Sequence, residues 1–240
     1  MTAGSSDNVL SAVSDNLKRI RENIAEAKFK AGRTDEVRLM GVTKTVDPEI
    51  VSFSVKEGVT LLGENRVQEF LDKRDRYEGS PEIHFIGGLQ TNKVKYIIDK
   101  VSMIHSADSE KLIREIDRRA VNAGLRMDIL IEVNIGGEES KSGVMPEALD
   151  ELAYMAAEMS GVRLRGLMAI PPIDVNGSSE IYFAKMQRLF SDLKDRTSGD
   201  DRFAVDTLSM GMSGDYETAI LHGSTIVRIG SVLYGKRIYR

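Results

Sequence analysis

The stretch VRLMGVTKTVDPEIVSFSVKEGVTLL, residues 37–62, contains the structural unit that recurs along this chain. Residues 37–42 form an apolar run that predicts a buried strand, and residues 60–62 predict a second, shorter strand. Between them, Asp47 suits a helix N-cap and Pro48 suits the first helical position, so residues 47–58 predict a helix. The stretch therefore predicts a β-α-β unit in which Lys44 follows the end of the first strand.

The same alternation continues to the end of the chain. Predicted strands cover residues 37–42, 60–62, 83–87, 102–105, 127–134, 162–170, 207–211 and 225–230. Predicted helices cover residues 47–58, 91–99, 108–124, 146–159, 178–194 and 214–223, with a further helix beginning near Arg66. Eight strands in 240 residues, each but the last followed by a helix, predict a single TIM-type (β/α)₈ barrel domain over residues 1–240, with a doubly wound open sheet as the alternative.

The N-terminal segment carries a different pattern. Apolar residues recur there at steps of three and four, at Leu10, Val13, Leu17, Ile20, Ile24 and Ala27. This spacing predicts an extra N-terminal helix over about residues 8–31. Because the pattern covers too few heptads for a coiled coil, we expect the helix to pack on the barrel.

Composition and charge exclude several classes of protein. Lys and Arg number 33 against 37 Asp and Glu, a net charge of -4, which argues against binding to nucleic acid or to an anionic membrane. The sequence has no cysteine, so it forms no disulfide and no thiolate metal site. The N-terminus shows no apolar run typical of a signal or membrane segment, and we expect a cytoplasmic protein.

The loops after the seventh and eighth predicted strands are rich in glycine and serine. They contain Ser209, Gly211, Ser213 and Gly214, and then Gly230 and Ser231 before a possible helical turn. In a TIM barrel these two loops often bind phosphate, because glycine lets the backbone approach an anion and serine donates its hydroxyl. The alternative is that both loops are ordinary turns.

Three polar residues at other strand ends extend this hypothesis. Lys44 lies on the same face of the barrel, where desolvation or a neighbouring cation would make its amine a Schiff-base nucleophile; otherwise it is a solvated loop lysine. A lysine together with these two glycine- and serine-rich loops, here called the phosphate cup, suits a phosphorylated aldehyde such as pyridoxal 5′-phosphate (PLP). Arg228 points to the same side as Gly230 and can meet the pyridine nitrogen, or else a helix carboxylate. Asn65 can contact the ring or its phenolic oxygen, or else cap a helix.

The three histidines, His84, His105 and His222, lie far apart in the sequence on different predicted elements. No carboxylate-rich or H-x-x-x-H pattern accompanies them, so we expect no metal site, and we interpret His84 as a core histidine. The P-loop and G-x-S-x-G motifs do not occur either, which argues against a nucleotide-phosphate site and a serine hydrolase.

Seven segments, in order, resemble one known family. They are VTKT, GENRVQE, HFIGGLQTNK, VNIGGEESKSG, LRGLMAIPP, LSMGMSGDYETAI and GSTIVRIGSVLYG, spread from about residue 37 to 237. Together they are similar to the YggS/PROSC family of pyridoxal phosphate homeostasis proteins. The resemblance implies an alanine-racemase-like barrel (fold-type III) with PLP held as an internal aldimine on Lys44. It also implies that Ser209, Gly211, Gly230 and Ser231 bind the phosphate, that Arg228 faces the pyridine nitrogen, and that Asn65 lies against the cofactor.

Fold alone does not separate an enzyme from a carrier here. An arginine at the pyridine nitrogen is permanently charged and cannot protonate the ring, although alanine racemases resemble this arrangement. Racemisation also needs a base on each face of the substrate, and in those racemases one comes from a C-terminal domain that we do not find before Arg240. We therefore expect a carrier that releases PLP or passes it to apo-enzymes. A fold-type III racemase or decarboxylase and a Schiff-base lyase or aldolase on a phosphorylated sugar are the alternatives.

Two further expectations concern the partners of such a carrier. Lys141, in the loop after the fifth predicted strand, is a candidate second amine for transferring PLP, although a solvated loop lysine explains its position as well. Without the second domain that helps racemases to dimerise, we expect a monomer.

Overall fold

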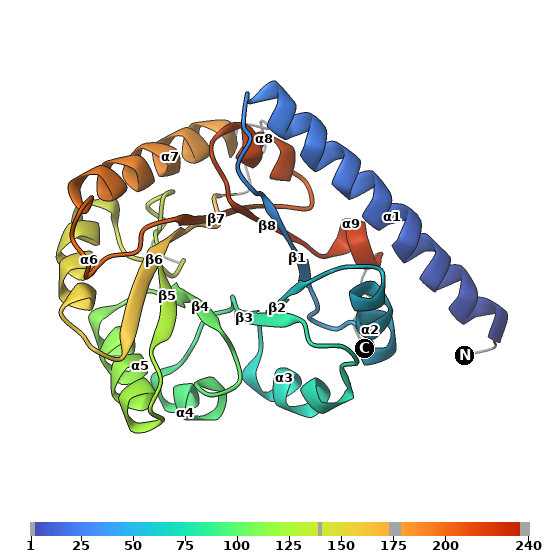
Figure 1. The fold of residues 1–240 in the computed structure, drawn as a ribbon, viewed down its shortest axis with the longest axis horizontal. Coiled ribbons are helices and arrows are strands. Elements are labelled where there is room, and N and C mark those ends of the chain that lie inside the picture. The colour runs from blue at the N-terminus through green and yellow to red at the C-terminus, as the bar shows by residue number, and fades with distance from the viewer. Residues whose placement is uncertain (1–2, 139–140, 173–178, 236–240) are drawn as a thin grey trace.

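Eight parallel strands close into a barrel in chain order, as the alternation of predicted elements requires (Figure 1). The computed structural model describes residues 3–138, 141–172 and 179–235. The strands are β1 (Arg38–Val42), β2 (Leu61–Glu64), β3 (Glu82–Phe85), β4 (Met103–Ala107), β5 (Met127–Glu132), β6 (Val162–Met168), β7 (Thr207–Met212) and β8 (Ile226–Ile229). Pairing of β1 with β8, in which Met40 faces Arg228, closes the barrel. The TIM-type prediction is confirmed, and the open sheet is wrong.

Helices surround the barrel on its outer face. They are α1 (Ala3–Lys30), α2 (Pro48–Lys56), α3 (Val67–Lys73), α4 (Val94–Ile97), α5 (Glu110–Asn122), α6 (Leu149–Ala157), α7 (Ser179–Arg196), α8 (Tyr216–Leu221) and α9 (Ser231–Tyr234). The predicted helix over residues 91–99 is shorter than expected, because a 3₁₀ turn at Thr91–Lys93 occupies its start. Among the described residues, no helix has the length and apolar character needed to cross a membrane.

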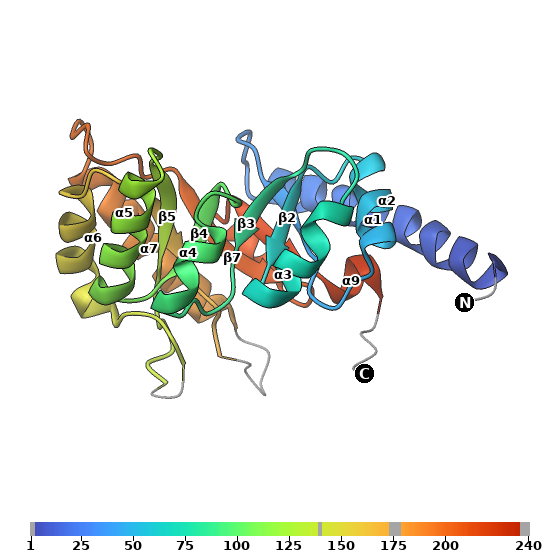
Figure 2. The ribbon, with the colours of Figure 1, turned by 90° about the horizontal axis from the view of Figure 1, so that it is seen from below.

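The N-terminal helix α1 packs along the outside of the barrel beside α8 and α9 (Figures 1 and 2). Its predicted apolar stripe is buried from Val13 to Ala27, and it packs in one cluster with Tyr216, Ile220 and Leu233. The burial of this stripe confirms the packing that the three-and-four spacing predicted.

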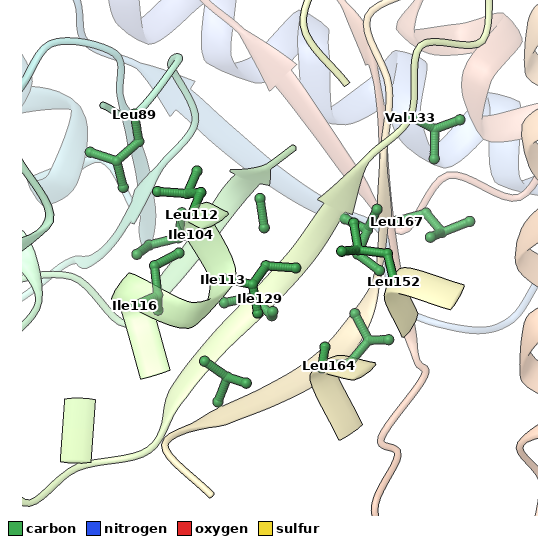
Figure 3. Close-up of a cluster of buried hydrophobic side chains, with 14 of the residues drawn as sticks. Leu89, Ile104, Leu112, Ile113, Ile116, Ile129, Val133, Leu152, Leu164 and Leu167 are labelled. Atoms are coloured by element: carbon green, nitrogen blue, oxygen red, sulfur yellow. The ribbon is translucent and has the colours of Figure 1, made fainter. Parts of the chain in front are cut away.

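The largest hydrophobic core lies between the barrel wall and the helices. Outward-facing residues such as Ile104, Ile129 and Leu164 pack against Ile113 of α5 and Leu152 of α6 (Figure 3). Because strand side chains alternate, the intervening residues point into the barrel. Each fully buried aliphatic side chain contributes about 1.5–3 kcal/mol to folding, so this layer holds the strand ends in place.

The barrel interior is part apolar and part polar. The barrel interior contains two small apolar clusters. One consists of Met40, Val42, Leu61, Ile86 and Ile226, and the other of Met103, Leu130 and Met168. Between them lie His84, His105 and Ser209, none of which has any exposed surface, and Arg228 with 4%. Buried polar groups of this kind need hydrogen-bond partners, and each of the four has one.

An ion-pair layer closes the barrel at the end where the strands begin. Glu82 binds Arg38 and His84, and Asp128, 8% exposed, binds Arg163 and Arg165. The hydrogen bond from His84, together with the Arg38 guanidinium, lowers the pKa of Glu82 to about 2 against the opposing effect of burial.

We expect this depressed pKa to make stability depend on pH. In the unfolded chain Glu82 titrates near 4.5, so its stabilising contribution is complete above that pH and is lost as the pH falls towards about 2. Glu82→Gln is expected to flatten the decrease in unfolding free energy over that interval, as measured by urea unfolding at a series of pH values. The exposed Glu147→Gln serves as the control. An unchanged slope in Glu82→Gln would contradict the assignment.

Candidate functional site

A cavity of about 580 Å³ opens at the end of the barrel where the strands terminate. It is lined by Val42, Lys44, Asn65, Ile86, Ile170, Met212, Ser213, Gly214, Arg228, Gly230 and Ser231. Six of the eight predicted site residues are therefore in its wall, namely Lys44, Asn65, Ser213, Arg228, Gly230 and Ser231. The volume is in the range of small-molecule sites. In Figure 2, α9 and the segment that leaves β5 lie at this same end of the barrel.

Another cavity, of about 520 Å³, lies between α1 and the starts of β1 and β2. Its arginines are used inside the protein: Arg21 donates to the Glu57 and Gly58 carbonyls, and Arg33 binds Asp35 and two further carbonyls. Because these two arginines already have partners, they offer little to an anionic ligand. The cavity at the strand termini is therefore the better candidate site.

Lys44 leaves the end of β1 through a constrained backbone. The next residue, Thr45, has φ 63°, a left-handed conformation that is unfavourable for a β-branched residue. Glu69 holds this turn by accepting a hydrogen bond from the Thr45 N–H at 2.5 Å, and Lys73 joins Glu69 to the Thr43 carbonyl at 2.8 and 2.9 Å. Burial would raise the pKa of Glu69, but the bonds from Lys73 and Thr45 outweigh it and keep the pKa low. Strain of this kind persists where the surroundings fix a functional geometry.

Arg228, on the neighbouring strand β8, also lines the cavity and is anchored by three carbonyl and hydroxyl contacts. Its Nη1 donates to the Ser209 carbonyl and hydroxyl, each at 2.7 Å, and its Nη2 donates to the Ala169 carbonyl at 2.9 Å. Burial lowers the pKa of Arg228 to about 10, while the charges of Glu132 and Asp215 oppose the shift. The guanidinium therefore remains a cation at neutral pH and offers only hydrogen-bond donors to the cavity.

The two glycine- and serine-rich loops form one unit, as their order in the barrel predicted. The Ser213 hydroxyl, in the loop after β7, accepts hydrogen bonds from the Gly230 N–H at 3.2 Å and the Val232 N–H at 3.4 Å. The expected helical turn is α9, which begins at Ser231 directly beside the cavity. Hydroxyls and a helix start thus meet at one end of the cavity.

Ser209 and Gly211 do not line the cavity. Ser209 is fully buried behind Arg228, where its hydroxyl contacts His105. Gly211 is buried against α8 with φ +90°, and a Cβ there would lie 2.5 Å from the Ala219 Cβ. The register of β7 against β8 shifts between Ser209 and Met212, which brings Met212 and Ser213 to the cavity instead. For these two residues phosphate contact stays a prediction, and the geometry favours a structural role.

Asn65 lines the cavity and has an unsatisfied polar atom. Its Oδ1 is buried and has no hydrogen-bond partner among the residues described. The alternative role, capping the next helix, does not apply: α3 takes Arg66 as its N-cap, and no side-chain bond closes it. A buried carbonyl oxygen without a donor costs about 1–3 kcal/mol, so the site favours a ligand that supplies one.

Two features beside the site are not predicted from the sequence. His84 and His105, though distant in sequence, are in contact inside the barrel, with 2.8 Å between His84 Nδ1 and His105 Nε2. Glu132 is 6% exposed, and burial, followed by the charge of Asp108, raises its pKa despite a hydrogen bond from Ser142 and the charge of Arg228. An acid within an otherwise apolar strand pattern was the available signal for Glu132.

The remaining candidates lie outside the cavity. Lys141 forms an ion pair with Glu138, 2.5 Å from Nζ to Oε2, in the loop beyond β5. Within residues 3–138, 141–172 and 179–235, no group of three or more potential metal ligands comes together.

Comparison with known proteins places this geometry in a family. The family model described as "Alanine racemase, N-terminal domain" matches residues 16–238. A pyridoxal phosphate homeostasis protein of Aquifex aeolicus is 46% identical over 94% of this chain and 98% of its own length. Its counterpart in Escherichia coli K12 is 36% identical over 95% of this chain and 97% of its own length.

Solved structures agree with the sequence relatives. The structure of PipY from Synechococcus elongatus with PLP bound matches with a TM-score of 0.80 and 26% identity, covering 93% of this chain and all of that chain. The structure of PipY without PLP matches with a TM-score of 0.83 over the same share of both chains.

Proposed function

This chain belongs to the family of pyridoxal phosphate homeostasis proteins, and we propose that it binds PLP through Lys44 and later releases it or passes it on. The observation that carries the proposal is the grouping of an amine, a buried guanidinium, an unsatisfied amide oxygen and a serine-rich loop pair around one cavity. PLP, when bound, supplies an aldehyde that reacts with a primary amine and a ring that withdraws electrons.

Each group in the wall has a place in this proposal. The Lys44 side chain provides the amine. The hydrogen bonds of Glu69 to the Thr45 N–H and to Lys73, here called the Glu69 clamp, fix the backbone from which that side chain projects. Arg228 donates a hydrogen bond to the ring nitrogen. Ser213, Gly230 and Ser231 receive the phosphate at the start of α9. The Asn65 amide lies against the ring, where a donor would satisfy its Oδ1.

The buried arginine limits what the cofactor could do, in an arrangement that alanine racemases resemble. With a pKa near 10, Arg228 cannot serve at neutral pH as the acid that protonates the ring, so the cofactor would remain a weak electron sink. We therefore expect no turnover of free amino acids. Sustained racemisation or decarboxylation by the pure protein, lost in Lys44→Ala, would replace the proposal with the enzymatic alternative.

The direct test is to load the protein with PLP, record its visible spectrum, reduce it with borohydride and map the modified peptide by mass. We expect visible absorbance and a pyridoxyl group on Lys44. A protein that stays colourless and unmodified with added PLP would refute the proposal, and trapping that depends on a sugar phosphate would favour the lyase or aldolase.

The Glu69 clamp should matter for binding. Glu69→Ala removes the acceptor for the Thr45 N–H and the partner of Lys73, so the Lys44 turn loses its support. We expect roughly tenfold weaker PLP binding, since an unpaired buried group costs about 1–3 kcal/mol. Glu69→Gln keeps a carbonyl oxygen for Thr45 and should retain most of the affinity. Equal affinity of Glu69→Ala and the unmodified protein would exclude the clamp.

Transfer to an apo-enzyme is the further part of the proposal, and Lys141 is its candidate second amine. The ion pair with Glu138 fixes the side chain only weakly, because both groups are partly exposed. We expect Lys141→Ala to slow activation of an apo PLP enzyme by the loaded protein without changing PLP binding to Lys44. A trap for free PLP separates handover from release, and equal handover rates would reject the role of Lys141.

A further inference from the structure

A chain of hydrogen bonds crosses the barrel interior from the Glu82 carboxylate to Arg228 in the cavity wall. Glu82 Oε1 lies 2.7 Å from His84 Nε2, and His84 Nδ1 lies 2.8 Å from His105 Nε2. His105 Nδ1 lies 3.0 Å from Ser209 Oγ, which in turn lies 2.7 Å from Arg228 Nη1. The five residues come from β3, β4, β7 and β8, so the chain joins the ion-pair layer at the strand starts to the site at the strand ends.

The two ends of the chain fix its direction. Arg228 only donates, so Ser209 Oγ accepts from it, and because the Glu82 carboxylate at the other end only accepts, the Ser209 hydroxyl donates its own proton to His105 Nδ1. His105 then carries its proton on Nε2 and donates it to His84 Nδ1. His84 likewise carries its proton on Nε2 and donates it to Glu82, which as a carboxylate only accepts. With both rings neutral, this is the one arrangement that satisfies every contact.

Burial keeps both rings neutral. His84 and His105 have no exposed surface, and burial lowers the pKa of each, most strongly for His105, where the charges of Arg228 and Arg38, and of His84 whenever it is protonated, add to the effect. If either ring gained a second proton, two N–H donors would face each other at one contact, or the ring would carry a buried charge with no water around it. The hydrogen bonds from Ser209 to Glu82 therefore all donate in one direction, towards Glu82.

We infer that His84 and His105 are positioning residues, which hold the Ser209 hydroxyl in one orientation and thereby fix the plane of the Arg228 guanidinium at the cavity. Three bonds anchor that guanidinium on the β6 and β7 side, to Ser209 O, Ser209 Oγ and Ala169 O. The histidine pair determines the direction of the bond at Ser209 Oγ. For the cofactor geometry, though not for the tautomers, the inference rests on the proposed function.

The first test reads the tautomers without any cofactor. The chain has three histidines, so long-range ¹H–¹⁵N spectra of the untagged, PLP-free protein can be assigned with single variants. We expect His84 and His105 both to carry their proton on Nε2 and to keep Nδ1 unprotonated at neutral pH. A proton on Nδ1 of either ring, or an imidazolium at either position, would overturn the inference.

The second test removes the chain while keeping the packing. His105→Phe leaves Ser209 without an acceptor, and we expect PLP to bind about tenfold more weakly and its visible band to shift. His105→Asn, whose carbonyl can still accept from Ser209, should restore most of both. His222→Asn, at the partly exposed end of α8, is the matched control and should leave them unchanged. Thermal unfolding of each PLP-free variant separates loss of fold from loss of positioning.

The two proposals fail in different ways. If the protein as it stands does not take up PLP, the proposed function fails, and the tautomers alone decide the histidine chain. If it binds PLP on Lys44 and His105→Phe folds with unchanged affinity and an unchanged band, the function stands and the positioning role is refuted.

Discussion

Lys44→Ala is expected to abolish the visible absorbance of PLP-loaded protein and the borohydride-stable modification. The amine at the end of β1 is the group in the cavity that can bond covalently to the aldehyde, while Arg228 and the serine loops supply only hydrogen bonds and charge. We expect retention of PLP to fall by roughly a hundredfold, equivalent to about 2.7 kcal/mol of binding free energy, measured by equilibrium dialysis.

Two controls separate the nucleophile from the charge. Lys44→Arg keeps a cation near the phosphate cup but cannot form the bond, so it should lose the absorbance while retaining more PLP than Lys44→Ala. Lys111→Ala, on the exposed face of α5, should behave as the unmodified protein. A wild-type band in Lys44→Ala, with a pyridoxyl group on another lysine, would place the attachment site elsewhere.

Gly211→Ala is expected to lower the unfolding free energy of the PLP-free protein by about 3 kcal/mol. The backbone there has φ +90°, and a Cβ would lie 2.5 Å from the Ala219 Cβ and 3.0 Å from the Tyr216 Cα. Left-handed strain of about 1–2 kcal/mol adds to an overpacking cost of about 1–3 kcal/mol, because α8 would have to move away from β7. Urea unfolding of protein stripped of PLP measures this change directly.

The matched control lies three residues away. Gly214 is exposed, and nothing lies within 4 Å of a Cβ built there, so Gly214→Ala should change stability by only a few tenths of a kcal/mol. The pair also decides the role of Gly211. A PLP-free Gly211→Ala protein of unchanged stability that binds PLP weakly would show that Gly211 contacts the phosphate, as the family resemblance implies.

The fold was predictable because its signals are local. Asp47 and Pro48 begin α2 as predicted, with the Asp47 carboxylate accepting from the Glu49 N–H at 3.0 Å. Apolar strand runs and helix periodicity recur in every unit, and the stripe from Val13 to Ala27 marks the packed face of α1. These patterns depend on neighbours in the sequence, so no tertiary knowledge was needed to identify them.

The site was predictable only in part. Lys44, Arg228 and Gly230 were placed by counting from strand ends, and the cavity contains all three. The same counting groups Ser209 with the phosphate loop, but Ser209 lies within β7 and is fully buried, with its hydroxyl against His105, so its contact with phosphate stays a prediction. A contact between strands this far apart in the chain is not shown by a single sequence.

Local sequence patterns specify the eight strands with the helices between them, the added N-terminal helix and the lysine at the end of the first strand, because alternation, capping and chain order are local properties. Which polar side chains meet depends on how the strands close into a barrel. His105 and Ser209 are 104 residues apart in the chain yet share a hydrogen bond, because closing the barrel turns both into one interior. In that interior, buried polar groups must form hydrogen bonds with one another, and such bonds hold the Arg228 guanidinium at the cavity.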